Sequence, residues 1–391
     1  MAAGDPERIM LEGTMAARRL VLLFDGTWNK PESNTNVERL RRLVAPRDAD
    51  GNPQLVNYIP GVGVKRGIAH LLGGAFGYGL SDHVLDGYLW LCETWQPGDL
   101  LYLFGFSRGA YTARSLGGMI RKCGLLRCDT DGSVARADAA AAYDFYRDIH
   151  SRPDDPAAVA FRAGHSIVID IHFIGVWDTV GSLGIPDTAS WFPYARKRYR
   201  FHDTELSKIV RYAYQALALD EHRADFVPTV WTRNPYTVKP GETLTSKKAE
   251  QIEIEQRWFI GSHSDVGGGN DCDGAGRQPD PLPELSLAWL QRKAIAAGLA
   301  CDAPFMPEAD ADTGVPRNSY AEFMGGLYKE FKPPFDRMLG TGVNERIDDS
   351  VWQRWLADPG YRSPSLVRAL ADASALISAD AVVRAPATPS A

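Results

Sequence analysis

Short, densely apolar runs alternate along the chain with segments of helical periodicity. Runs of this kind are typical of strands buried on both faces of a sheet, and they lie at 19–25, 56–60, 100–104, 166–177, 227–232 and 256–260. Segments with apolar residues at helical spacing lie at 36–43, 81–95, 110–120, 135–149, 206–220 and 284–299. Strands alternating with helices predict an α/β fold with a mostly parallel sheet and helices on both faces.

The pattern predicts one large domain with loop insertions. No linker-like shift in composition divides residues 18–378, and the clearest elements fall within 18–300. We expect residues 1–17 to form a loose leader. The Ala- and Pro-rich tail at 379–391 is expected to be disordered, because it has too little apolar surface to bury.

Composition and charge narrow the class of protein. With 45% hydrophobic and 24% charged residues, the chain has the composition of a soluble globular protein. A formal charge of −6 argues against nucleic acid as a partner. The five cysteines lack the paired spacing of a metal site, so we expect no metal, and reduced thiols in a protein made in the cytoplasm. The amino terminus has no apolar signal region, so export would need a signal-independent route.

A G-x-S-x-G motif stands between a predicted strand and a predicted helix. Ser107 lies at its centre, flanked by Gly105 and Gly109. In a nucleophile elbow the serine takes a strained backbone conformation, and the glycines two residues away relieve the crowding. The alternative is a glycine-rich turn whose serine is incidental.

Three further polar residues fall where predicted strands end: Asp25, Asp178 and His263. Ligands of open α/β sheets bind at the carboxyl ends of the strands. A serine nucleophile needs a base, and an imidazole needs a carboxylate to hold its tautomer. The order Ser107, Asp178, His263 is that of the α/β-hydrolases. Asp178 has rivals: Asp265 lies two residues past the histidine, where it could instead fix the loop, and Asp220 ends the segment 206–220.

A tetrahedral intermediate needs two backbone N–H donors for its oxyanion. One should be the N–H of Arg108, and the second should come from the turn at Gly26 and Thr27. The alternative for this turn is a tight turn capped by its own side chains, which Asp25 could hydrogen-bond into shape. The glycine-rich stretch 61–80 does not fit a dinucleotide loop and predicts either a substrate-lining loop or core packing.

Five ordered sequence blocks carry a family resemblance over about residues 18 to 290. They are LLFDGTWN, GFSRGAYTAR, GVWDTVGSLG, ALALDEHR and WFIGSHSDVGGG. In this order they resemble an α/β-hydrolase family that includes the catalytic domain of type VI secretion phospholipase effectors. The resemblance implies an α/β-hydrolase fold and an esterase or phospholipase triad at Ser107, Asp178 and His263. Gln215 stands where the resemblance would place a histidine. We expect no counterpart of the effectors' large membrane-targeting module in the hundred or so residues that follow the last block.

The sequence therefore predicts a serine hydrolase that forms an acyl-enzyme on Ser107, without a cofactor. Lipid or phospholipid esters are the first expected substrates and small soluble esters the second. A lid-like insertion at about 185–205 begins with interleaved aromatic and basic residues at 185–201, which predict either contact with an anionic membrane surface or a solvated loop. The alternative from another class is a non-catalytic binding protein of the same fold.

Overall fold

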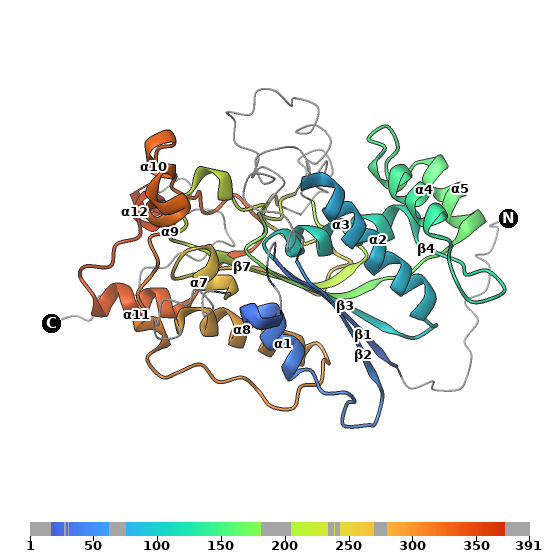
Figure 1. The fold of residues 1–391 in the computed structure, drawn as a ribbon, viewed down its shortest axis with the longest axis horizontal. Helices are drawn as coiled ribbons and strands as arrows, with labels where there is room; N and C mark the ends of the chain where they lie inside the picture. The colour runs from blue at the N-terminus through green and yellow to red at the C-terminus, as the bar shows by residue number, and fades with distance from the viewer. Residues whose placement is uncertain are drawn as a thin grey trace.

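A seven-stranded parallel sheet forms the centre of the protein (Figure 1). The structure of the protein is a computed structural model, which describes residues 17–26, 29, 31–61, 76–180, 205–233, 238, 243–269 and 280–371. The strand order is β2-β1-β3-β6-β7-β8-β9, and every neighbouring pair is parallel. The strands are β1 (Arg19–Phe24), β2 (Gln54–Ile59), β3 (Leu100–Phe106), β6 (Ile171–Trp177), β7 (Val210–Ala218), β8 (Glu253–Phe259) and β9 (Glu345–Ile347).

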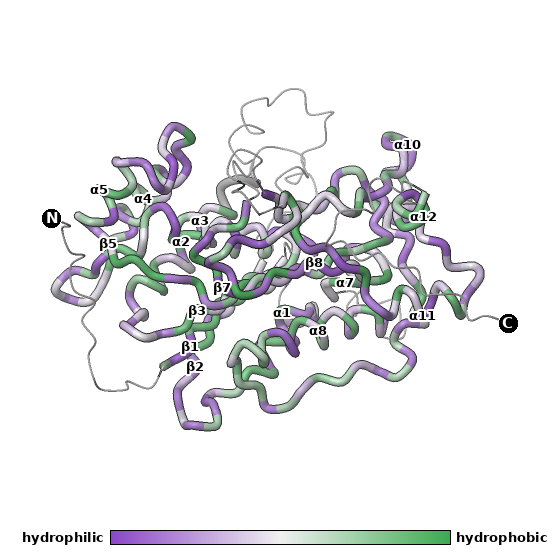
Figure 2. The backbone as a smooth tube through the Cα atoms, turned by 180° about the vertical axis from the view of Figure 1, so that it is seen from behind, coloured by the Kyte–Doolittle hydropathy of each residue, from purple (hydrophilic) through white to green (hydrophobic). Residues whose placement is uncertain are grey.

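Helices cover both faces of the sheet, as the sequence predicts. On one face, α2 (Phe76–Thr94), α3 (Arg108–Cys123) and α4 (Arg136–Arg147) pack into a core with the apolar side chains of β1, β3 and β6. On the other face, α1 (Asn36–Leu43) and α8 (Leu282–Ala296) enclose a second core (Figure 1). Because both faces are buried, strands β1 and β3 are apolar almost throughout, and hydrophobic colouring extends along the sheet (Figure 2).

Residues after 300 add strand β9 to the same sheet and build a third core. There, β9 and the helices α11 (Asp349–Ala357) and α12 (Pro364–Ala371) pack against apolar side chains of β7 and β8. The remaining short elements are α5 (Pro156–His165), α7 (His263–Gly267), α9 (Ser319–Glu322), α10 (Tyr328–Phe331), η1 (Pro31–Ser33), η3 (Ala224–Phe226), η5 (Ala311–Thr313) and η6 (Phe323–Gly326).

Three sequence predictions of secondary structure are wrong. The expected helix at 206–220 is strand β7. Its second half, residues 213–218, is buried on both faces of the sheet, so the apolar–polar alternation that separates a strand from a helix is missing there. The expected strand at 166–177 is divided: β5 (Ser166–Ile167) pairs antiparallel with β4 (Leu125–Leu126), and β6 starts only at Ile171. The segment 227–232 forms two isolated bridges and no strand.

Several expectations fall outside the described residues. They are the leader at 1–16, Thr27, most of the glycine-rich stretch, the lid-like insertion up to 204 and the tail after 371. Among the described residues, no helix has the length and apolar character needed to span a membrane.

Candidate active site

Ser107 occupies the sharp turn between β3 and α3. Its backbone has a φ of 58° and a ψ of −120°, a conformation that non-glycine residues rarely adopt. The two flanking glycines are required by contact. A Cβ at position 105 would lie 2.4 Å from the carbonyl oxygen of Gly109, and one at 109 would lie 2.1 Å from that of Phe24. The turn therefore has the geometry of a nucleophile elbow.

Replacing Gly109 with alanine tests this crowding. We expect Gly109→Ala to lower the free energy of unfolding by about 3 kcal/mol, because the added methyl group meets backbone atoms that cannot move aside. Gly164→Ala in α5 is the matched control: open space surrounds that position, so this variant should be neutral or stabilising by about 1 kcal/mol at most. Urea unfolding of both variants gives the comparison, and equal stabilities would contradict the crowded turn.

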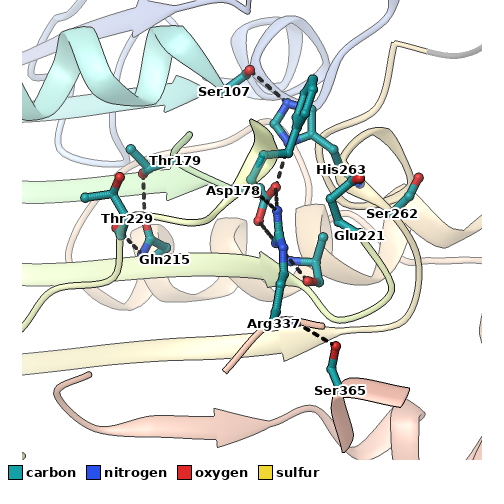
Figure 3. Close-up of polar contacts among 12 residues, drawn as sticks. Ser107, Asp178, Thr179, Gln215, Glu221, Thr229, Ser262, His263, Arg337 and Ser365 are labelled. Atoms are coloured by element: carbon teal, nitrogen blue, oxygen red, sulfur yellow. Dashed lines mark hydrogen bonds and ion pairs between the residues drawn. The ribbon is translucent and has the colours of Figure 1, made fainter. Parts of the chain in front are cut away.

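The structure brings together the three side chains that the sequence places at strand ends (Figure 3). The Nε2 atom of His263 lies 2.8 Å from the Oγ atom of Ser107. The Nδ1 atom of the same ring lies 2.6 Å from Oδ2 of Asp178. The ring is held between two aromatic side chains, with centroids 4.7 Å from that of Phe106 and 5.1 Å from that of Phe226. His263 can thus contact a serine hydroxyl and a carboxylate at once.

Burial and neighbouring charges set the protonation of this pair. Burial alone would raise the pKa of Asp178, but the charge of Arg337 and the hydrogen bond with His263 outweigh it, so the pKa lies below its usual range. Burial lowers the pKa of His263, and the contact with Asp178 only partly opposes this effect. The resting pair is therefore a carboxylate beside a neutral imidazole, which can accept a proton at Nε2.

Arg337 completes the surroundings of Asp178, and the sequence analysis missed it. Its Nη1 donates to Oδ1 of Asp178 at 2.6 Å, and its Nη2 donates to Oδ2 at 3.0 Å. The backbone N–H of Ala218 also donates to Oδ1, at 3.0 Å. Arg337 lies in an irregular segment of the weakly patterned region after 300, so no strand end or motif pointed to it.

Glu221 supports the loop that carries His263, and it too was missed as a functional residue. Its carboxylate accepts the backbone N–H of His263 at 3.2 Å and pairs with Arg223 at 2.7 Å. Burial would raise the pKa of Glu221, but Arg223 outweighs it and lowers the pKa to about 2. The sequence block ALALDEHR contains Glu221 and Arg223, so the family resemblance was the one sequence feature that could have pointed to them.

The expected oxyanion donors are only partly described. The N–H of Arg108 opens α3 directly after Ser107. The Gly26 turn passes beside the serine, since a Cβ at position 26 would lie 3.4 Å from Cβ of Ser107. The N–H of Gly26 itself donates to Oδ1 of Asp25 at 2.7 Å. A second donor from this turn would therefore have to come from a later residue, and Thr27 lies outside the described residues.

Asp25 holds this turn by hydrogen bonds. In addition to the Gly26 N–H, its carboxylate accepts the hydroxyl of Thr35 at 2.8 Å and that of Tyr58 at 2.6 Å. Burial raises the pKa of Asp25 in spite of these bonds. These contacts are those of the alternative role that the sequence left open, in which Asp25 shapes the turn.

The rivals of Asp178 serve other loops. Oδ2 of Asp265 accepts the backbone N–H groups of Ser262 at 2.8 Å and Arg317 at 2.9 Å. Asp220 follows strand β7, and its Oδ2 accepts the Gly261 N–H at 2.8 Å. Both carboxyls thus fix the segment around His263.

We expect the Asp265 carboxyl to make the fold less stable as pH rises from about 4 to 8. Burial and the facing Asp280 carboxyl raise the pKa of Asp265 to about 8. The unfolded chain loses this proton near pH 4, so the proton stabilises the fold less and less as pH rises from 4 to 8. Asp265→Asn should remove this loss, because its amide can donate to Asp280 at any pH. Between pH 5 and pH 8, the Tm of the wild type should fall by at least about 2 °C more than the Tm of the variant. If the two Tm curves run parallel, the raised pKa of Asp265 is contradicted.

Gln215 belongs to a buried polar network under the sheet rather than to a helix. From β7 its amide contacts the side chains of Arg114 at 3.3 Å and Gln256 at 3.1 Å (Figure 3 shows its contacts with Thr179 and Thr229). Within the described part of the chain, no group of three histidine, cysteine, aspartate or glutamate side chains could hold a metal ion.

Fold and site together define an α/β protein of the hydrolase type, with a nucleophile elbow at the carboxyl edge of its sheet. The family described as "T6SS, Phospholipase effector Tle1-like, catalytic domain" matches residues 18–293, and the chain belongs to it. It is thus a member of a family of lipid-ester hydrolases. The match covers the five sequence blocks, so the family expectation from the sequence is confirmed.

Individual relatives are longer than this chain. An uncharacterized protein of Saccharomyces cerevisiae is 32% identical over 463 residues, which cover 84% of this chain and 64% of the yeast protein. An uncharacterized protein from Pseudomonas aeruginosa superposes with a TM-score of 0.44 at 18% identity, over 77% of this chain and 49% of that one. The Tle1 effector bound to the VgrG spike superposes with a TM-score of 0.38 at 17% identity, over 67% of this chain and 52% of that one. The chain thus spans about half to two thirds of these proteins.

Proposed function

We propose that the protein is a serine esterase that hydrolyses carboxylic ester bonds of lipids, phospholipids in the first place. The observation that carries the proposal is the continuous contact from Asp178 through His263 to Ser107, at 2.6 Å and 2.8 Å, on a strained elbow turn. A hydroxyl becomes a nucleophile when a neutral base accepts its proton, and this arrangement supplies the base and its orienting carboxylate.

In the proposed first step, the Oγ atom of Ser107 attacks the ester carbonyl carbon while its proton passes to Nε2 of His263. The carbonyl π electrons move to oxygen, and the N–H of Arg108 is suited to donate to that oxyanion. When the tetrahedral intermediate collapses, the bond to the alcohol breaks and the imidazolium gives its proton to the leaving alkoxide. The products are the free alcohol and an acyl-enzyme on Ser107.

In the second step, water replaces the alcohol. His263 takes a proton from the water as it attacks the acyl carbon, and the second intermediate collapses by breaking the bond to Oγ of Ser107. The proton returns to Oγ and a fatty acid leaves. Asp178 remains ionised throughout, because burial penalises its charge less than Arg337 and His263 stabilise it.

Family membership supports a lipid ester over a small soluble ester. The test is a comparison of substrates together with covalent labelling. Purified protein should react with a fluorophosphonate probe at Ser107, located by mass spectrometry, and should release fatty acid from phospholipid vesicles. Faster turnover of short p-nitrophenyl esters than of vesicles would favour the small-ester alternative. A folded protein that neither labels nor hydrolyses would favour a non-catalytic binding protein.

The proposed activity is expected to decrease only at acidic pH, where His263 becomes protonated. His263 must be neutral to accept the serine proton, and burial lowers its pKa below the ordinary value of about 6.5. The acid limb of kcat/KM against pH should therefore have a midpoint below 6.5, and activity should persist at pH 6. Hydrolysis of a soluble ester from pH 4.5 to 8 measures it, and a midpoint above 7 would contradict the neutral resting imidazole.

A further inference from the structure

Arg337 is a fully buried cation paired with the carboxylate that contacts His263. The exposed fraction of both Arg337 and Asp178 is 0%. The guanidinium donates to both oxygens of Asp178, at 2.6 Å and 3.0 Å, and so forms a bidentate pair (Figure 3). Pairs of this geometry fix the plane and rotation of a carboxylate more strictly than a single hydrogen bond does.

Two backbone carbonyls fix the guanidinium in turn. Nη1 donates to the carbonyl oxygen of Ala218 at 2.8 Å, and Nη2 donates to that of Phe226 at 2.6 Å. Ala218 ends strand β7, and Phe226 is the residue whose ring contacts the imidazole of His263. Arg337 therefore ties together the carboxylate, the end of a central strand and one wall of the imidazole pocket.

The backbone that carries Arg337 is anchored on both sides. Its own N–H donates to Oγ of Ser365 in α12 at 3.1 Å, and the N–H of Phe335 donates to the carbonyl oxygen of His222 at 2.9 Å. This segment lies beyond residue 293, where the family match ends. A part of the chain outside the matched catalytic domain thus reaches the centre of the site.

We propose that Arg337 is a positioning residue for the proposed ester hydrolysis: it fixes the Asp178 carboxylate against Nδ1 of His263 and keeps His263 neutral until the serine proton arrives. The inference rests on the proposed function for its catalytic consequence. Its contacts, however, predict an effect on His263 that can be measured without turnover.

The charges around the imidazole give the sign of this effect. Asp178 contacts the ring, Glu221 accepts the backbone N–H of His263, Arg223 pairs with Glu221, and Arg337 pairs with Asp178. The two carboxylates and two guanidinium groups balance, so a proton added to His263 has no net negative charge to neutralise. Without Arg337 the set carries one excess negative charge, which favours a proton on the Asp178–His263 pair.

The experiment titrates His263 by NMR, with labelled histidine, in the wild type, Arg337→Met and Arg337→Lys. Arg337 contacts the carboxylate that contacts His263, and a nearby charge moves a pKa by about one to three units. Arg337→Met should therefore raise the apparent pKa of His263 by about one unit or more. Arg337→Lys keeps the charge and should stay near the wild type. In kinetics, the acid limb of kcat/KM should shift upward only in Arg337→Met. Both variants should lose kcat by about tenfold or more, with KM little changed, because neither replacement reproduces the bidentate pair.

Arg18→Met is the matched control. Arg18 makes the same type of bidentate pair with Asp99, at 2.9 Å and 2.6 Å, where β3 begins rather than where it ends. Its loss should lower Tm without moving the His263 titration or the acid limb. If Arg337→Met lowers Tm and kcat but leaves the His263 titration and the acid limb unchanged, Arg337 is only a structural residue and the proposal is overturned.

Two further outcomes remain decisive. If Arg337→Met does not fold, Arg337→Lys carries the test: a wild-type His263 titration with tenfold lower kcat at near wild-type Tm supports positioning, and an unchanged kcat overturns it. If the wild type neither labels nor hydrolyses while the His263 titration still follows Arg337, the hydrolase assignment fails and the coupling of Arg337 to His263 stands. If the wild type is labelled at Ser107 but the His263 titration does not shift in Arg337→Met, the hydrolase assignment stands and the role of Arg337 is overturned.

Discussion

Ser107→Ala is expected to lower kcat for ester hydrolysis by a factor on the order of 10⁶, as the loss of a serine nucleophile does in other hydrolases with this set of groups. Without Oγ no acyl-enzyme can form, and water would have to attack without the orientation that the elbow gives the hydroxyl. Substrate binding should survive, since the change removes one oxygen atom beside His263. Stopped and continuous assays of fatty acid release measure kcat, and fluorophosphonate labelling should disappear.

Ser264→Ala is the matched control for this loss. It removes a hydroxyl one residue beyond His263 and leaves the contacts among Ser107, His263 and Asp178 in place. Its kcat should stay within about twofold of the wild type, as expected of a change outside the reacting groups. If Ser107→Ala instead kept most of the activity with its Tm unchanged, the elbow serine would not be the nucleophile.

The sequence predicted the sheet, its two helical layers and the three side chains of the candidate site because these depend on local signals. A polar residue at the end of a buried apolar run is visible in the sequence, and parallel strands place such ends at one edge of the sheet. Asp178, whose φ is 37°, and Ser107, whose φ is 58°, both follow buried strands directly. His263 could be singled out among the histidines for the same reason.

The missed features depend on long-range packing. Strand β7 reads as a helix because burial on both faces removes the alternation that marks a strand, and only its neighbours β6 and β8 define it. Arg337 stands 159 positions from Asp178 in an irregular segment, so neither periodicity nor a motif connects the two. The position of Asp178 at a strand end was therefore predictable, whereas its pairing with Arg337 depends on how the part after 300 folds back on the sheet.

Asp178→Asn is expected to affect both catalysis and stability. An asparagine amide can donate to Nδ1 of His263, which favours the tautomer with its proton on Nε2, where the serine proton has to go. The same change in a serine protease lowers kcat about 10⁴-fold with the geometry intact. Here it also leaves the Arg337 cation buried without a carboxylate, which costs about 3–5 kcal/mol. Hydrolysis assays and urea unfolding measure the two effects separately.

Asp99→Asn separates the general cost of breaking an arginine–aspartate pair from the cost at this site. Asp99 pairs with Arg18, whose side chain is partly exposed, so water can solvate the remaining guanidinium. This variant should lose about 1 kcal/mol or less and keep its kcat. Because Asp178 and Arg337 are both sealed from water, the double variant Asp178→Asn with Arg337→Met should regain part of the stability lost in Asp178→Asn while remaining inactive. A double variant no more stable than Asp178→Asn would mean that the buried charge is not what destabilises the single variant.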